Sequence, residues 1–285
     1  MVVNMIATLK RTKEILNKYN LHAKKGYGQN FLIDPNVVNR IVDEAHIDKE
    51  CGVIEIGPGI GSLTEVLVSS AKKVICYEID KDMVDILNDN FKGCQNLKII
   101  EKDFLKADLR EDLDYFSDCK KVLVVSNLPY YITTPIVFKL LGEEVGINDF
   151  YFMVQKEVGE RFSGKPKTKD YNSLSVAIMF QADSKILFNV SRNSFYPAPN
   201  VDSVIINIKK VQKDYKVNNK AEFLKFVQSI FSQRRKTLVN NLSVSCSLSK
   251  AEIEEKLEEN GFKKTVRSEE LEVSQIVNLY NIFRG

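Results

Sequence analysis

Short apolar runs alternate with amphipathic stretches between residues 50 and 155 of this chain. The apolar runs predict strands at Val53–Ile56, Lys73–Ile79, Leu97–Glu101, Val122–Ser126 and Phe150–Val154. The stretches between them predict helices at Ser62–Ser70, Lys81–Phe91 and Pro135–Leu141. Such alternation is typical of a parallel sheet covered by helices, so we expect a doubly wound, Rossmann-like α/β fold.

The pattern changes along the rest of the chain. Further strand-like runs lie at Ser175–Phe180, Ile186–Val190 and Val201–Ile208, and they would complete the sheet. Beyond Gln212 the apolar spacing becomes helical, at Ala221–Leu242, Ser249–Asn260 and Glu269–Phe283. We therefore expect an N-terminal segment at 1–33, an α/β domain at 34–211 and a small all-helical domain at 212–285.

Composition and charge indicate a globular protein and the kind of partner it binds. The chain has 285 residues, of which 44% are hydrophobic, which is enough for a globular core. Residues 1–33 carry six Lys or Arg against one Glu, residues 34–155 carry 13 basic against 22 acidic, and residues 156–213 carry 10 against five. Basic flanks around an acidic centre favour a nucleic-acid partner.

The five cysteines are scattered and show no metal-ligand spacing, which favours a reducing, cytoplasmic location. The N-terminal residues contain no apolar core of a signal peptide, and no run reaches membrane-spanning length. We therefore expect a cytoplasmic protein that requires neither a membrane nor a metal.

Two candidate ligand sites follow predicted strands. Asn127-Leu128-Pro129-Tyr130 comes directly after an apolar run and offers an amide, backbone carbonyls and an aromatic ring, which suit a flat base bearing an amine. The second site is the GxGxG turn from Gly57 to Gly61, which precedes a predicted helix. This glycine spacing is typical of S-adenosylmethionine binding and differs from the GxGxxG of dinucleotide folds. Two strand-end sites suggest a donor and an acceptor.

Two carboxylates strengthen the cofactor interpretation. Glu78 ends the second predicted strand, about twenty residues after the glycine turn, where it can accept hydrogen bonds from ribose hydroxyls. Asp103 follows the third strand, where it can accept a hydrogen bond from the adenine amine of the ligand. The glycine turn and both acids lie at consecutive carboxyl ends of strands, where open α/β sheets bind ligands.

In these residues and their order, the chain resembles the ribosomal RNA adenine dimethyltransferase family, in particular the branch that modifies the small subunit. Six segments carry the resemblance in order: GQNFL from Gly28, EIGPGIG from Glu55, NLPY from Asn127, QKEV from Gln155, FYPAPNVDS from Phe195 and FSQRRKTL from Phe231. The resemblance implies that the cofactor, S-adenosylmethionine, contacts Asn30, Leu32, Gly57, Gly59, Glu78, Asp103 and Asn127.

The family's chemistry assigns roles to the second site. The Asn127 side-chain oxygen and the Leu128 carbonyl would each accept one hydrogen of the adenine amine, which draws the nitrogen towards tetrahedral geometry. Tyr130 would stack on the base, and similarity to the family suggests that Phe195 closes its other face. The implied reaction dimethylates two adjacent adenines in the 3′-terminal hairpin of 16S ribosomal RNA, with a role in small-subunit biogenesis.

Contacts with RNA are less defined by the sequence. Arg234, Arg235 and Lys236 are predicted to lie on a helix of the small domain, where adjacent residues point in different directions, and the family uses this region for ribosomal RNA. Lys165, Lys167 and Lys169 are weaker candidates. We expect the enzyme to be a monomer.

Three other functions remain open from the sequence. A related large-subunit methyltransferase, which confers macrolide resistance, shares the glycine turn and the Asn-x-Pro-Tyr site. Leu128 and the Phe195 and Phe231 segments favour the small-subunit branch. A non-catalytic RNA-binding assembly or transcription factor could retain the fold, although intact Glu78 and Asn127 argue against it. A nicotinamide-dependent dehydrogenase is disfavoured by the glycine spacing.

Overall fold

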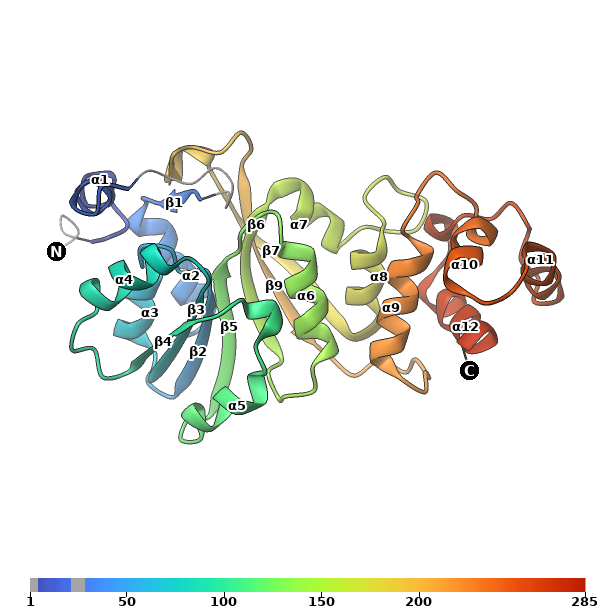
Figure 1. Ribbon diagram of the computed structural model, residues 1–285, viewed down its shortest axis with the longest axis horizontal. Helices are drawn as coiled ribbons and strands as arrows, with labels where there is room; N and C mark the ends of the chain where they lie inside the picture. Colours follow the sequence, from blue (N-terminus) through green and yellow to red (C-terminus); the bar gives the residue numbers. More distant parts are fainter. Residues whose placement is uncertain (1–4, 22–28, 285) are drawn as a thin grey trace. The chain divides into compact units, whose positions relative to one another are not determined.

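The computed structural model describes residues 5–21 and 29–284, and its backbone divides into two compact units (Figure 1). The first unit comprises Met1–Lys139, Glu144–Gly159 and Lys185–Lys209, and the second comprises Leu140–Glu143, Glu160–Ser184 and Lys210–Gly285. A division at residue 212 was expected from the sequence. The second unit also takes in 140–143 and 160–184, upstream of that point.

A seven-stranded sheet forms the centre of the fold, in the order β4-β3-β2-β5-β6-β9-β7. The strands are β2 Cys51–Ile56, β3 Lys73–Glu78, β4 Leu97–Glu101, β5 Lys121–Asn127, β6 Asp149–Gln155, β7 Ala182–Val190 and β9 Ser203–Lys210. β4, β3, β2, β5 and β6 run parallel, whereas β9 pairs antiparallel with β6. The five strands expected from 50 to 155 are therefore confirmed, each within two residues of its predicted bounds.

The helices that accompany the parallel strands also follow the sequence pattern. They are α1 Leu9–Lys18, α2 Pro35–Glu44, α3 Thr64–Ser70, α4 Lys81–Asn90, α5 Leu109–Leu113, α6 Thr133–Gly142 and α7 Lys156–Phe162. Polar side chains fix their starts, since the Asp34 carboxylate caps α2 and the Asp80 carboxylate caps α4. The helices expected near residues 62, 81 and 135 are confirmed as α3, α4 and α6.

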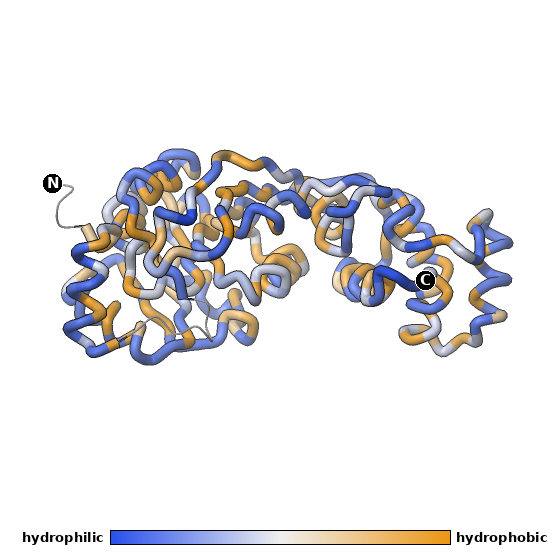
Figure 2. Tube along the Cα trace, turned by 90° about the horizontal axis from the view of Figure 1, so that it is seen from above, coloured by the Kyte–Doolittle hydropathy of each residue, from blue (hydrophilic) through white to orange (hydrophobic). Residues whose placement is uncertain are grey.

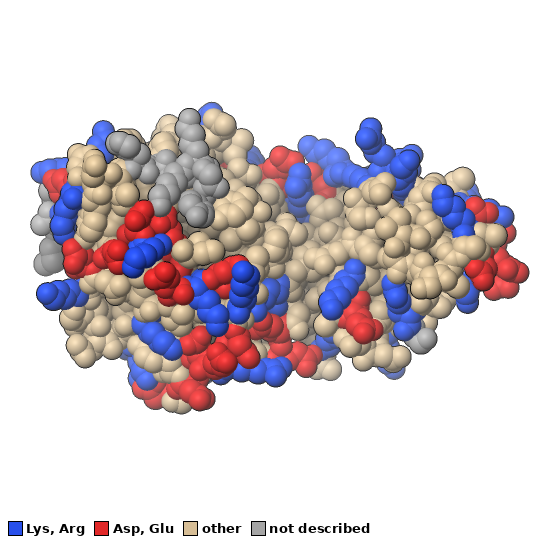
Figure 3. All heavy atoms as spheres, viewed as in Figure 1, with Lys and Arg blue, Asp and Glu red and all other residues tan. Residues whose placement is uncertain are grey.

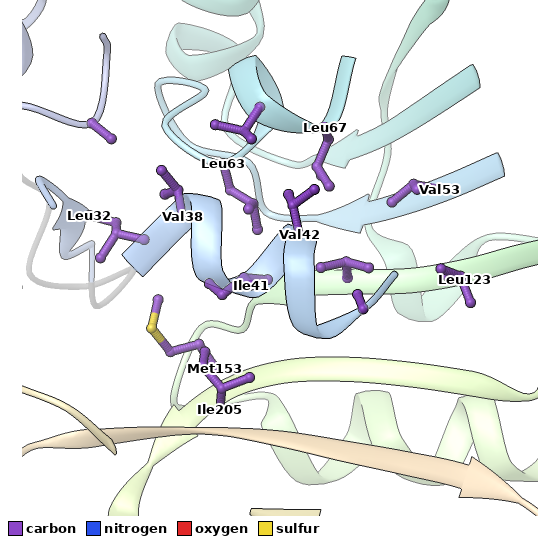
Figure 4. Packing of buried hydrophobic residues seen from close by; sticks show 14 of the residues in the cluster. Leu32, Val38, Ile41, Val42, Val53, Leu63, Leu67, Leu123, Met153 and Ile205 are labelled. Carbon is purple, nitrogen blue, oxygen red and sulfur yellow. The ribbon is translucent and has the colours of Figure 1, made fainter. Parts of the chain in front are cut away.

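The main core of the first unit lies where α2 and α3 cover the sheet. Apolar side chains of α2, such as Val38, Ile41 and Val42, pack with Val53 of β2 and Leu123 of β5 (Figure 4). These side chains are almost fully buried. The parallel strands carry continuous apolar runs, and the helices cover them. This packing covers one face of β2 and β5 with apolar side chains.

A short two-stranded ribbon joins the N-terminal segment to the sheet domain. β1 Phe31–Leu32 pairs antiparallel with β8 Phe195–Tyr196, with Leu32 opposite Phe195. The Phe31 ring packs with Ile15 and Leu16 of α1 in a second apolar cluster. The ribbon therefore fixes residues 29–32 beside the sheet.

The second unit contains the remaining helices and has its own aromatic core. They are α8 Ser173–Gln181, α9 Lys220–Ile230, α10 Leu238–Ser245, α11 Lys250–Glu259 and α12 Val273–Arg284. The ring of Phe223 lies 4.3 Å from Phe180 and 5.5 Å from Tyr280 between centroids. Hydrophobic and hydrophilic residues intermix along the helices near the C-terminus (Figure 2), as amphipathic packing requires. In α8, by contrast, six of the nine residues are buried.

Two predictions for this part of the chain are wrong. Ser175–Phe180 is not a strand but most of α8, which begins with a capping box between Asn172 and Ser175. Ala221–Leu242 is not one helix, since a turn at 231–237 separates α9 from α10. The helix expected at Ser249–Asn260 is α11, which begins with a capping box between Ser249 and Glu252.

Candidate active site

The strand order reverses between β2 and β5, which is where an open α/β sheet forms a crevice. β3 and β4 lie on one side of β2, whereas β6 follows on the other side of β5. The glycine turn begins directly after β2, and Asn127 is the last residue of β5. A cavity lies at this point within the first unit, open at the carboxyl ends of the strands.

This cavity brings together nearly all of the site residues predicted from the sequence. Those that line it are Asn30, Leu32, Gly57, Gly59, Glu78, Asp103, Asn127, Leu128 and Tyr130. They come from β1 and the residue before it, from the turns after β2 and β4, from the end of β3, and from the end of β5 and the segment that follows it. Gly28 lies outside the described residues.

The glycine turn requires glycine for two separate reasons. Gly57 and Gly59 have φ values of +65° and +59°, in the left-handed region that disfavours side chains. A Cβ atom at Gly57 would lie 3.3 Å from the Pro129 ring, and one at Gly59 would lie 3.4 Å from the Phe31 ring. The turn is therefore packed between the Asn127–Tyr130 segment and the N-terminal ribbon.

Glu78 is held in a fixed position by backbone donors. Its Oε1 accepts hydrogen bonds from the N–H groups of Ile79 and Asp80, at 2.8 and 2.9 Å, and its Oε2 accepts one from Gly59 at 3.2 Å. Burial raises the pKa of Glu78, while these hydrogen bonds oppose that shift. The carboxylate retains lone pairs for further donors such as hydroxyl groups.

Asp103, which follows β4, is held by a single backbone hydrogen bond. Its Oδ1 accepts a hydrogen bond from the Leu105 N–H at 3.0 Å and so caps the short helix Phe104–Lys106. Its Oδ2 lies 4.0 Å from Lys106 Nζ. The carboxylate is therefore anchored through one oxygen at the wall of the cavity.

Glu55 is a cavity residue that the sequence marked only as the acid before the glycines. It is 2% exposed, and its Oε2 accepts a hydrogen bond from Thr64 Oγ1 at 2.6 Å. Burial raises the pKa of Glu55 to about 7, against hydrogen bonds from Thr64 and Cys76 that lower it. The cavity thus contains a carboxyl group that titrates near neutral pH.

Sequence reasoning missed several cavity residues, among them Gln29, Ser62, Ile79 and Tyr131. Gln29 Nε2 donates a hydrogen bond to Asp80 Oδ2 at 3.1 Å, which ties the N-terminal segment to the start of α4. The buried Ser62 Oγ has no hydrogen-bond partner within residues 5–21 and 29–284. The position of Ser62 after the glycines is a signal that could have identified it.

The Asn127–Tyr130 segment is fixed to both neighbouring strands. The Leu128 N–H donates to the Met153 carbonyl of β6 at 3.2 Å, and Ser126 Oγ donates to the Ile56 carbonyl of β2 at 2.5 Å. The Leu128 side chain is buried, which leaves the Asn127 amide beside the cavity. Two oxygen acceptors from consecutive residues can therefore bind the two hydrogens of one amine.

The two predicted stacking residues are placed differently. The Tyr130 hydroxyl lies 2.9 Å from Ser203 Oγ, so its ring is fixed as part of the cavity wall. Phe195 is 3% exposed, packs in the main core and does not line the cavity. Contact between the Phe195 ring and a base would require the β1–β8 ribbon to move. In this structure Phe195 supports Leu32.

The basic residues predicted on a helix lie instead on the turn between α9 and α10. Arg234, Arg235 and Lys236 are all exposed there, because the turn need not bury one face as a helix does. Arg234 Nη2 donates a hydrogen bond to the Thr168 carbonyl at 3.1 Å, which joins this turn to the segment 163–172. That segment carries Lys165, Lys167 and Lys169, all of them exposed. Figure 3 shows Lys and Arg side chains gathered along the upper side of the second unit.

Within residues 5–21 and 29–284, no group of three or more His, Cys, Asp or Glu side chains could hold a metal ion. No helix in the described part of the chain is long and apolar enough to cross a membrane.

Two solved structures share this architecture over most of the chain. A dimethyladenosine transferase from Plasmodium falciparum superposes with a TM-score of 0.66 and 26% identity, covering 87% of this chain and 96% of that one. The 23S rRNA methyltransferase ErmE has a TM-score of 0.58 at 24% identity, covering 90% of this chain and all of the other. The second likeness concerns the fold alone.

Sequence relatives are more similar. Proteins called ribosomal RNA small subunit methyltransferase A from Bacillus mycoides and Bacillus cereus are each 47% identical over 281 residues, covering 97% of this chain and 96% of theirs. A family model described as ribosomal RNA adenine dimethylase matches residues 20–284. The resemblance and the fold inferred from the sequence are thus confirmed, and the chain belongs to the ribosomal RNA adenine dimethylase family.

Proposed function

We propose that the chain transfers methyl groups from S-adenosylmethionine to the exocyclic amines of two adjacent adenines in the 3′-terminal hairpin of 16S ribosomal RNA. The observation that carries this proposal is the packing of Pro129, beside Asn127 and Leu128, against the glycine turn at Gly57. An acceptor site and a donor site therefore share one cavity. The 47% identical relatives are small-subunit methyltransferases by name, which supports the choice of substrate.

The cavity fits the proposed cofactor. Glu78 would accept hydrogen bonds from the ribose hydroxyls, and Asp103 would accept one from the adenine amine. The rest of the cofactor would be contacted by Asn30, Leu32, Gly57 and Gly59. The unpartnered Ser62 hydroxyl supports a polar ligand, because such a ligand can supply the missing hydrogen bond. When bound, S-adenosylmethionine supplies an electrophilic methyl group on a sulfonium. No metal ligand is needed for this chemistry.

The chain's contribution to the reaction would be to prepare the acceptor. An adenine amine is a weak nucleophile because its lone pair is delocalised into the ring. Hydrogen bonds from the amine to Asn127 Oδ1 and to the Leu128 carbonyl would favour a tetrahedral nitrogen with a localised lone pair. Asn127, which lines the same cavity as the cofactor residues, would also contact the cofactor.

Asn127 would act by positioning and not as a base. An amide takes up no proton at neutral pH, so the amine proton would leave after transfer, from the cationic product. Tyr130 would stack on the adenine, which is worth about 1–3 kcal/mol per base and offsets part of the cost of extruding it. Holding the base at the donor would supply much of the rate.

The second unit offers a surface for the RNA backbone. Arg235 and Lys236 are exposed on the turn that Arg234 joins to the segment 163–172. Clustered cations suit phosphate groups, and phosphate contacts orient an RNA without reading its sequence. We propose that these residues bind the phosphates of small-subunit ribosomal RNA within an assembling subunit. The enzyme would act in the cytoplasm and as a monomer.

The test is methyl incorporation from labelled S-adenosylmethionine into unmethylated small subunits and, separately, into large-subunit RNA. Nucleoside analysis of the product then distinguishes dimethyladenine from other methylated bases. We expect dimethyladenine in the small-subunit substrate alone. Label confined to large-subunit RNA would contradict the substrate assignment, and absence of label from both would contradict the proposed reaction.

A further inference from the structure

Two large apolar side chains are exposed at the wall of the cavity. Within the described residues, the exposed large hydrophobic side chains are Leu9, Ile79, Tyr131, Ile186, Val201 and Val244. Of these, only Ile79 and Tyr131 line the cavity, and they are 53% and 55% exposed. Single exposed apolar residues are ordinary, but two at one cavity indicate surfaces that a ligand covers.

The two residues lie on different sides of the site. Ile79 follows Glu78, and its N–H donates to that carboxylate, so it belongs to the cofactor side. Tyr131 follows Tyr130 on the acceptor side, beyond the residues assigned to the amine. A cofactor held at Glu78 and Asp103 would cover Ile79, whereas Tyr131 lies on the side where the acceptor base would enter.

The residues on both sides of Tyr131 make fixed contacts. Before it, the Tyr130 hydroxyl lies 2.9 Å from Ser203 Oγ. After it, the Ile132 N–H donates to the Pro129 carbonyl at 3.2 Å, and Thr133 Oγ1 donates to the same carbonyl at 3.2 Å. An exposed ring between neighbours held in this way offers a stacking surface that loses less conformational freedom on binding.

We propose that Tyr131 stacks on the nucleotide next to the adenine that occupies the pocket. This inference rests on the proposed function, in which the two target adenines are adjacent. Extruding one adenine removes a stacking partner from its neighbour, and the exposed ring of Tyr131 replaces that partner. Tyr130 and Tyr131 then serve consecutive nucleotides, one inside the cavity and one at its rim.

The test compares Tyr131→Ala and Tyr131→Phe with the wild-type chain in steady-state transfer to unmethylated small subunits. Removing the ring should lower kcat/KM about tenfold, within the range measured for loss of one base stack. Tyr131→Phe keeps the ring and should retain wild-type kcat/KM. Val244→Ala removes an exposed apolar side chain in the second unit and should have no effect.

Two measurements separate stacking from a change in the fold or in the donor site. The affinity for S-adenosylmethionine and the melting temperature should be unchanged in Tyr131→Ala. A wild-type kcat/KM in Tyr131→Ala overturns the inference, as does an equal loss in Tyr131→Phe. If the wild-type chain itself transfers no methyl group, the proposed function fails, and this inference fails with it.

Discussion

Asn127 and Leu128 place two oxygen acceptors at the end of β5, where the chain leaves a buried strand. The hydrogen bond from the Leu128 N–H to Met153 uses the donor of that residue and leaves its carbonyl for another partner. Because β5 is a central strand between β2 and β6, these acceptors have little freedom to move. The acceptor chemistry at the residue scale therefore depends on position more than on acidity.

Replacing Asn127 with alanine should abolish methyl transfer, with at least a hundredfold loss, as for removal of a preorganised hydrogen-bonding group in other active sites (~10²–10³). The Asn127 amide is expected to touch only part of the cofactor, so binding of S-adenosylmethionine should persist. Single-turnover transfer and calorimetric cofactor titration measure the two effects. Normal turnover in a folded Asn127→Ala variant would contradict the assigned role.

Glu55 gives the cavity a specific pH dependence. Its pKa is about 7 in the folded chain, against an ordinary value of 4.5, because burial disfavours the charged form. A carboxyl group whose pKa is raised by folding stabilises the fold below its unfolded pKa, and that contribution is lost as the pH rises through the folded pKa. Stability should therefore fall between pH 5 and pH 8.

Glu55→Gln should remove this dependence, since glutamine keeps an oxygen acceptor for Thr64 and carries no charge. From pH 5 to pH 8, the free energy of unfolding of the wild type should fall by about 2 kcal/mol relative to the variant. Urea unfolding at several pH values, without cofactor, provides the measurement. Parallel pH profiles for the two proteins would show that Glu55 titrates normally.

The central contact at the scale of elements is between the two turns. The glycine turn after β2 meets Pro129 after β5, and the β1 strand covers it from the other side at Phe31. Neither turn could shift without displacing the other. Donor and acceptor positions are therefore set by one packing arrangement.

Gly57→Ala should disturb both positions, because its Cβ would meet Pro129 in addition to straining the backbone at φ +65°. Gly93→Ala is a matched control, with φ +84° and no atom within 4 Å of the added Cβ. Each variant should lose about 1 kcal/mol of stability from strain. Only Gly57→Ala should also lose cofactor affinity and transfer activity, and equal activity losses in the two variants would contradict the account.

Sequence patterns predicted the parallel strands well because their apolar runs are continuous and bounded by turn residues. The same criterion failed at α8, where Leu174, Val176, Ala177, Ile178 and Phe180 are all buried, so no polar face reveals the helical period. The capping box at Asn172 was the available signal. For the site, motif positions identified the lining residues, whereas the burial of Glu55 and Phe195 depends on packing that no local pattern reports.

At the scale of the whole molecule, the cavity and the proposed RNA surface carry charges of opposite sign. The carboxyl groups of Glu55, Glu78 and Asp103 line the cavity of the first unit. Exposed cations gather in the second unit, on the turn between α9 and α10 and on the segment 163–172. This division suits a small cationic cofactor at one place and an RNA backbone at another.

Arg235→Ala combined with Lys236→Ala should weaken binding to small subunits and reduce the slope of log affinity against log salt by about 2, one for each lost phosphate contact. Arg234 is left unchanged because it holds the turn to Thr168. The matched control, Lys92→Ala with Lys185→Ala, removes the same charge from exposed positions of the first unit. An equal change of slope in the control would refute a localised RNA surface.

Mapping of dimethyladenine along 16S ribosomal RNA tests the central claim most directly. Small subunits from cells that lack this modification would be treated with the wild-type chain and S-adenosylmethionine, and the RNA analysed fragment by fragment by mass spectrometry. The account predicts dimethyladenine at two adjacent positions of the 3′-terminal hairpin, and none with Asn127→Ala. Methylation at any other position, or on an atom other than the exocyclic amine, would contradict it.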